Sequence, residues 1–115
     1  MKRLLPSLRA KKRYLAFELI SEKQTNATRG DIVKEIMSSA SALLGDVQAS
    51  ECELKILGFE NNKGVVQCAH IKVKETRAVI AAITRVNGRR ATLHILGSSG
   101  TVKRVTEKFL QNEKV

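Results

Sequence analysis

The order of hydrophobic patterns along the 115 residues predicts an α+β fold with a four-stranded antiparallel sheet and two helices on one of its faces. Four short segments carry the apolar residues typical of strands, and two longer segments repeat them about every 3.6 residues, as helices do. The segments follow one another as β-α-β-β-α-β, which is the ferredoxin-like split βαβ plan, and an extra helix follows at the C-terminus. We expect a basic N-terminal arm over residues 1–11 and a single domain over residues 12–115.

The first strand is predicted over residues 14–20. Leu15, Phe17 and Leu19 alternate onto one face, while Ile20 departs from the alternation. Such a nearly continuous apolar run is typical of a strand that is covered on both faces. We therefore expect this strand at the centre of the sheet.

The first helix is predicted from Thr28 to Gly45. The residues from Thr28 to Asp31 resemble a capping box, in which two side chains satisfy the free N–H groups of a helix start. Gly45 suits the left-handed conformation that ends many helices. The apolar residues of one helical face are Ile32, Val33, Ile36, Ala40, Leu43 and Leu44.

A hairpin is predicted next, with strands over residues 52–60 and 65–71. The connection at residues 61–64 contains Asn and Gly, which tolerate the positive φ angles of hairpin turns. Val65 and Val66 are equally apolar, so the sequence leaves open which face of the second strand is buried.

The remaining chain predicts a second helix over residues 72–85, a fourth strand over residues 89–96 and a terminal helix over residues 101–110. An Asn-Gly dipeptide provides the tight turn before the strand. The GSSG stretch at residues 97–100 is expected to break the chain before the terminal helix. Both helices carry apolar stripes and are candidate surfaces for a protein partner.

Charge is the strongest indication of function. Lys and Arg number 21 against 11 Asp and Glu, for a formal net charge of +10, and residues 1–13 contain no acid. So large an excess repels itself in a compact fold, which points to a polyanionic partner, most commonly a phosphate backbone. A membrane is disfavoured because no segment resembles a lipid anchor or a long apolar span. The first apolar run is too short for a signal peptide, so we expect a cytoplasmic protein.

Basic pairs and one small-residue loop supply the candidate RNA contacts. Small residues at 97–101 would let a phosphate approach the backbone, although a tight turn with a capped helix explains them as well. Single surface lysines are often merely solvated, so the prediction rests on the set. The first and fourth strands should be neighbours, and we expect the arm and the turn before the fourth strand to share one region. The predicted RNA-binding residues are Arg9, Lys11, Lys12, Arg13, Arg89, Arg90, Ser99, Gly100, Thr101, Lys103 and Arg104.

Base stacking on the sheet is not expected. Tyr14 and Phe17 have opposite parity in the first strand, so they cannot share a face, and the third strand has no aromatic residue. Contacts to phosphates and to RNA shape are therefore favoured over sequence readout.

Metal binding and catalysis are not expected from this chain. Cys52, Cys68, His70 and His94 lack the closely paired spacing of a zinc site, and we expect both cysteines to be reduced thiols. No activated nucleophile or carboxylate pair is evident. We predict no catalytic residue, no metal site and no cofactor bound by the chain itself.

Four motifs together resemble a known family. They are LPSLR at residues 5–9, KRYLAFE at residues 12–18, RVNGRR at residues 85–90 and LGSSGT at residues 96–101. In this order and spacing they resemble the protein component 2 family of archaeal-type ribonuclease P, from about residue 4 to residue 110. One departure is Ser98, where the resemblance leads us to expect a bulkier apolar residue.

The resemblance implies a function and partners. Ribonuclease P is the ribonucleoprotein endonuclease that removes the 5′ leader of precursor tRNA, and its RNA subunit carries the catalytic Mg²⁺ ions. The resemblance implies a non-catalytic subunit that binds ribonuclease P RNA and ribonuclease P protein component 3, and that serves precursor tRNA indirectly. It also implies a heterotetramer with two copies of each protein. The alternatives are a stand-alone RNA-binding or ribosomal protein, a small-molecule regulatory module and a phosphate-cleaving enzyme of similar architecture.

Overall fold

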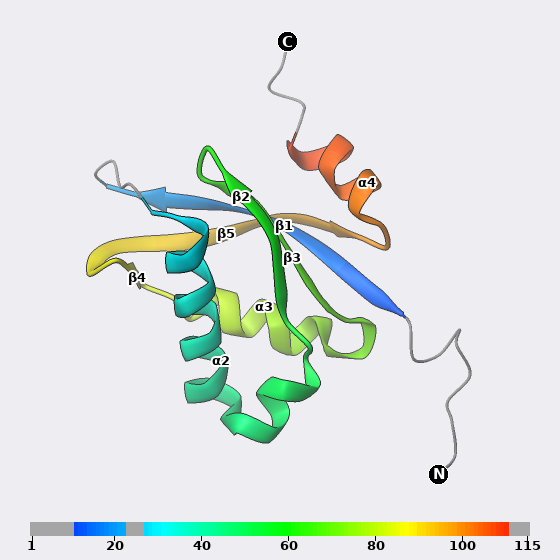
Figure 1. Cartoon of the computed structure of the whole chain (residues 1–115), viewed down its shortest axis with the longest axis horizontal. Helices are drawn as coiled ribbons and strands as arrows, with labels where there is room; N and C mark the ends of the chain where they lie inside the picture. The colour runs from blue at the N-terminus through cyan, green and yellow to red at the C-terminus, as the bar shows by residue number, and fades with distance from the viewer. Residues whose placement is uncertain (1–10, 23–26, 111–115) are drawn as a thin grey trace.

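A computed structural model of the chain describes residues 11–22 and 27–110. Within them, an antiparallel sheet has the strand order β2-β3-β1-β5-β4; α2 and α3 pack on one face, and α4 lies against the other (Figure 1). The strands are β1 (Lys12–Ser21), β2 (Lys55–Glu60), β3 (Lys63–Ala69), β4 (Arg85–Val86) and β5 (Arg89–Ser99). The helices are α2 (Arg29–Glu51), a 3₁₀ turn η1 (His70–Lys72), α3 (Val73–Ala81), α4 (Val102–Val105) and its π-helical continuation η2 (Thr106–Leu110).

The predicted α+β class and antiparallel sheet are confirmed, but the expected number of four strands is wrong. The fifth is β4, a two-residue strand that pairs with the start of β5. A helix was predicted over residues 72–85, whereas α3 ends at Ala81. The Asn-Gly turn draws the preceding residues into a hairpin, and their pairing with β5 replaces a last helical turn.

β1 occupies the predicted central position, between β3 and β5. Leu15 and Phe17 are completely buried against the helices, and Ala16 is completely buried on the opposite face. Ile20 is 49% exposed, because the second face is covered only near the start of β1. The strand begins at Lys12, earlier than predicted, because β3 pairs with the charged residues Lys12 and Arg13 as well.

The capping box predicted at the start of α2 is present. Thr28 Oγ1 accepts from the N–H of Asp31 at 3.2 Å, and Asp31 Oδ2 accepts from the N–H of Thr28 at 2.9 Å. The same carboxylate oxygen also accepts from Asn87 Nδ2 at 2.9 Å, which ties the helix start to the β4–β5 hairpin. Gly45 interrupts the helix with a φ of 81°, but it is a kink and not the end, since helical residues continue to Glu51.

The β2–β3 hairpin turns at Asn61 and Asn62, both with positive φ, as the sequence predicted. Both faces of β3 are buried, against different helices. Val66 and Cys68 pack toward α2 and α3, and Val65 packs toward α4. β3 starts at Lys63 and ends at Ala69, and the next residues form the 3₁₀ turn rather than continuing the strand.

The last strand, β5, continues through residues 97–99, which the sequence analysis assigned to a loop. Gly97 pairs with Ala16, Ser98 with Leu15 and Ser99 with Tyr14. Pairing with the early start of β1 supplies the backbone hydrogen bonds that small residues by themselves would not favour. A register shift between Ala16 and Phe17 marks an irregularity in this ladder.

The terminal helix predicted over residues 101–110 is confirmed in outline. Thr101 caps it, since Oγ1 accepts from the N–H of Arg104 at 3.2 Å. Val105 is fully buried against Ala16 and Val65 on the face of the sheet opposite α2 and α3.

Candidate nucleic-acid interface

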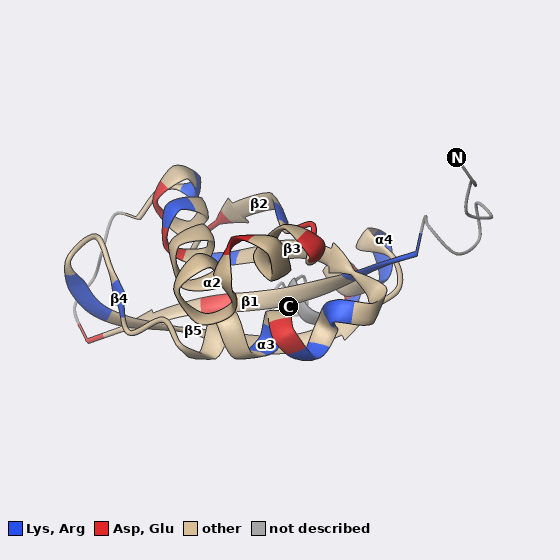
Figure 2. Cartoon of the chain, turned by 90° about the horizontal axis from the view of Figure 1, so that it is seen from below, with Lys and Arg blue, Asp and Glu red and all other residues tan. Residues whose placement is uncertain are grey.

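The predicted RNA-binding residues fall at two ends of the molecule and not in one region. β1 and β5 are antiparallel, so Tyr14 pairs with Ser99 and Ser21 pairs with Ala91. Arg89 and Arg90, at the start of β5, therefore lie a strand length away from Lys12 and Arg13. Figure 2 shows basic residues at both the β4–β5 hairpin and the end where β1 starts. Among the described residues, the two basic groups therefore do not share one region, whereas residues 1–10 of the expected arm, Arg9 included, lie outside the described residues.

At the start of β1, Arg13 belongs to a cluster that the sequence did not reveal. Its Nη2 donates to Ser98 Oγ at 3.5 Å, and Nη2 of Arg77 in α3 donates to the same oxygen at 3.4 Å. We call Arg13, Arg77 and Ser98 the arginine–serine cluster. Arg77 is exposed, while Arg13 and Ser98 are half-buried. The hydroxyl of Ser98 occupies a position where the family resemblance suggested a bulkier apolar side chain.

The two lysines beside Arg13 differ in their surroundings. Lys12 Nζ forms an ion pair with Glu53 Oε1, so a carboxylate already compensates its charge. Lys11 is exposed. Of the basic run at residues 11–13, Lys12 is thus the least available to a phosphate.

The small-residue loop at residues 97–101 offers fewer candidate phosphate contacts than the sequence predicted. Ser99 is buried, and the Thr101 hydroxyl accepts from the helix backbone as a cap. Gly100 is exposed and adjoins Arg13, since an ideal Cβ there would lie 3.7 Å from Arg13 Nη1. Lys103 and Arg104 are exposed on α4.

The second basic end is the β4–β5 hairpin, and we call Arg85, Arg89 and Arg90 the hairpin arginines. All three are exposed, and Arg85 lies directly opposite Arg90 in the ladder. Arg85 Nη1 donates to the carbonyl of Gly88 at 3.2 Å. Like charges placed opposite each other destabilise a hairpin. Arg85 was not among the residues predicted from the sequence, although a two-residue Asn-Gly turn would have paired it with Arg90.

The prediction that the sheet cannot stack bases agrees with the packing. Phe17 is fully buried and stacks on Phe59, with ring centroids 6.0 Å apart, on the helix-covered side. Tyr14 is half-buried beside α4 on the opposite face. Neither ring offers an open platform to a base.

Cys52 and Cys68 are fully buried free thiols. Burial raises the pKa of both thiols, and a hydrogen bond with Thr76 opposes that shift. Thiols held protonated in this way are poor nucleophiles and poor metal ligands. Within residues 11–22 and 27–110, no group of three His, Cys, Asp or Glu side chains is arranged to hold a metal ion.

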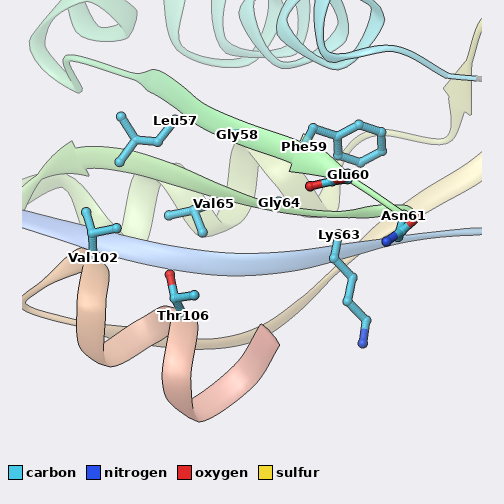
Figure 3. Close-up of a pocket in the computed structure, with 10 residues that line it drawn as sticks. All are labelled: Leu57, Gly58, Phe59, Glu60, Asn61, Lys63, Gly64, Val65, Val102 and Thr106. Carbon is cyan, nitrogen blue, oxygen red and sulfur yellow. The ribbon is translucent and has the colours of Figure 1, made fainter. Parts of the chain in front are cut away.

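A groove of about 380 Å³ separates the β2–β3 hairpin from α4 (Figure 3). It lies on the face that α4 only partly covers, with Val102 and Thr106 along one wall and Leu57 and Val65 along the other. Its lining is mixed and holds no cluster of basic residues. No helix of the described part of the chain is both long and apolar enough to cross a bilayer.

Comparisons with known proteins agree with the motif resemblance. A sequence model of the Rpp14/Pop5 family matches residues 13–110. "Ribonuclease P protein component 2" of Methanosarcina mazei is 73% identical over 115 residues, covering 100% of this chain and 97% of that protein. The protein of the same name in Pyrococcus furiosus is 33% identical over 111 residues, covering 95% of this chain and 91% of the relative.

The fold also resembles a solved structure. A chain of the cryo-EM structure of yeast ribonuclease MRP matches with a TM-score of 0.70 over 87% of this chain and 79% of that chain, at 13% identity. At that identity the likeness concerns the fold, whereas the family follows from the sequence matches, which extend along nearly the whole chain. This chain therefore belongs to the Rpp14/Pop5 family.

Proposed function

We propose that this chain is a protein subunit of ribonuclease P, which removes the 5′ leader of precursor tRNA. The observation that carries the proposal is the 73% identity, over the full length, to a protein named ribonuclease P protein component 2. The chain supports the catalytic RNA and does not perform the cleavage, which uses Mg²⁺ ions held by the RNA. The proposal places the chain in the cytoplasm.

Electrostatics supply the mechanism. A chain with a net charge of +10 and exposed arginines at two ends lowers the repulsion between RNA phosphates that folding brings together. The RNA then needs fewer divalent ions to reach its active form. The contacting residues are the predicted Arg9, Lys11, Arg13, Arg89, Arg90, Gly100, Lys103 and Arg104, together with Arg77 and Arg85. Three of the predicted residues have smaller roles. Lys12 is paired with Glu53, Ser99 is buried, and the Thr101 hydroxyl caps α4.

The proposal includes a protein partner, ribonuclease P protein component 3, and a heterotetramer with two copies of each chain. Three exposed apolar side chains of α2 could contribute to this contact, namely Met37, Leu43 and Val47, which are 39%, 51% and 73% exposed. Helix α3, which the sequence analysis favoured, instead buries its larger stripe residues, Val79 and Ile80. We therefore assign the partner contact to α2.

We also regard the fold as a split βαβ plan with an added edge strand. Leaving out β4, the strand order is β2-β3-β1-β5, and both main helices pack on one face. This is the arrangement expected for the four long strands of that plan.

Reconstitution tests the proposed function. Precursor-tRNA cleavage is measured with an archaeal ribonuclease P RNA and component 3, with and without this protein, over a range of Mg²⁺ concentrations. We expect a large gain in rate at low Mg²⁺ that shrinks as Mg²⁺ rises. Salt-sensitive RNA binding without any gain in cleavage would favour the stand-alone RNA-binding protein instead.

A further inference from the structure

Arg13 and Arg77 come from different layers of the fold and converge on one atom. Arg13 lies near the start of β1 and Arg77 in α3, yet an Nη2 atom of each lies within 3.5 Å of Ser98 Oγ. The two nitrogens are therefore no more than about 7 Å apart, a distance at which two positive charges repel.

Within residues 11–22 and 27–110, no carboxylate forms an ion pair with either guanidinium. Two nearby acids pair with lysines instead, Glu53 with Lys12 and Glu51 with Lys72 at 3.5 Å. Ser98 is a neutral acceptor and offsets no charge. An anion held between the two arginines would be favoured by both of them.

The donor set suits one tetrahedral oxyanion. Each guanidinium is a planar fork of N–H donors that matches two oxygens of a phosphate, and two such forks cover different edges of the same group. The hydroxyl of Ser98 keeps its own proton to donate, since it only accepts from the arginines. Arg77 is exposed and the adjoining Gly100 has no side chain, so the cluster is open to a ligand.

We infer that Arg13, Arg77 and Ser98 form a site for a single phosphate group of the RNA backbone, which both arginines share. The inference rests on the proposed function for the identity of the RNA. It goes beyond that function by assigning one phosphate to two arginines and a role to Ser98.

Salt dependence of RNA binding tests the sharing. Each phosphate that a protein neutralises contributes about 0.7–0.9 to the slope of log affinity against log salt. If both arginines bind one phosphate, the double variant R13Q/R77Q should lose about one such unit, and each single variant less. Each single variant should weaken binding roughly tenfold, as expected for loss of a charge-assisted hydrogen bond.

Two double variants remove the same charge and serve as controls. In R13Q/R89Q one arginine lies near the start of β1 and the other at the start of β5, at the opposite end of the molecule, so the slope should fall by more than in R13Q/R77Q. In K34Q/K55Q the residues are exposed and lie on α2 and β2, neither of which contributes a residue to the cluster, so the slope should stay close to that of the unaltered chain. Two outcomes would overturn the shared site. In the first, the salt slope of R13Q/R77Q falls by two units, and in the second it falls no further than that of K34Q/K55Q.

A second measurement does not depend on ribonuclease P. Inorganic phosphate, compared with chloride at equal ionic strength, should raise the melting temperature of the unaltered chain more than that of R13Q/R77Q, because a bound ligand stabilises the folded state. Equal shifts in both proteins would contradict the site. If the unaltered chain binds ribonuclease P RNA without salt dependence, the proposed function fails, and this measurement still decides the site.

Discussion

At Gly64 the chain packs too closely for a side chain. An ideal Cβ there would lie 2.6 Å from the carbonyl oxygen of Gly58 and 2.7 Å from Cζ of Phe17. Phe17 cannot withdraw easily, because it is fully buried and stacked on Phe59. The β2–β3 hairpin approaches β1 closely because this residue is glycine.

Gly64→Ala should therefore lower the free energy of unfolding by about 1–3 kcal/mol, as overpacking of a core does. Gly58→Ala is the matched control, because nothing lies within 4 Å of its ideal Cβ, and its effect should stay within about 0.5 kcal/mol. Urea denaturation of both variants checks the prediction. If both variants lost the same free energy of unfolding, the close contacts around Gly64 would not oppose a side chain there.

Asp31 gives a residue-scale prediction of pH dependence. Hydrogen bonds from the Thr28 backbone and then from Asn87 lower the pKa of this carboxyl below its ordinary value of 3.8. The ionised form is thus favoured by folding, so its contribution is complete above pH 3.8 and is lost as the pH falls through the lower, folded-state pKa.

Thermal melting as a function of pH should show this loss in the unaltered chain, with a smaller loss in Asp31→Asn. The asparagine keeps the shape and can still accept a hydrogen bond, but it does not titrate in this range. Parallel pH profiles for the two proteins would mean that Asp31 is not coupled to folding.

At the scale of elements, the β4–β5 hairpin is hydrogen-bonded to the start of α2 and also places two like charges opposite each other. Asn87 has a φ of 57° and donates to Asp31, so the turn is attached to the start of α2. Arg85 and Arg90 nevertheless face each other across the ladder. The hairpin holds its charges together at some cost in stability, which is understandable if RNA neutralises them.

Arg85→Gln should therefore have opposite effects on stability and on binding. The variant relieves repulsion, so its melting temperature should rise relative to that of the unaltered chain at low salt. At high salt this difference should shrink, because salt already screens the repulsion. Its affinity for ribonuclease P RNA should fall. A stability difference that does not change with salt would argue against repulsion between Arg85 and Arg90.

At the scale of the whole molecule, the sheet separates two basic surfaces. β5 has 11 residues, so its ends lie ~33 Å apart at a rise of about 3.3 Å per residue. That distance is several times the Debye length of about 8 Å at physiological salt. The two surfaces should therefore bind separate phosphates without influencing each other.

Combining R77Q with R89Q should give a loss in log affinity equal to the sum of the single losses, within about 0.3–0.5 kcal/mol in free energy. Titration of labelled ribonuclease P RNA with the four proteins of the cycle measures this. A large coupling energy would mean that one RNA feature contacts both ends, or that binding reshapes the chain.

Local patterns in the sequence determined much of the fold. The capping box, the two Asn-containing turns and the central strand were predictable from local sequence, whereas Gly45 was expected to end the first helix and instead kinks it. The basic imbalance and the absence of a stacking platform were also readable from composition and strand parity. Four motifs carried the family resemblance, and the family model that matches residues 13–110 confirms it.

Only the tertiary structure decided which charges meet. Arg13 reaches Ser98 across 85 residues, Arg77 reaches it across 21 and Lys12 reaches Glu53 across 41. No local period encodes such contacts, because they depend on strand register and on how α3 crosses the sheet. For the same reason the extension of β5 through residues 97–99 escaped the sequence analysis, since those small residues become a strand through pairing with β1.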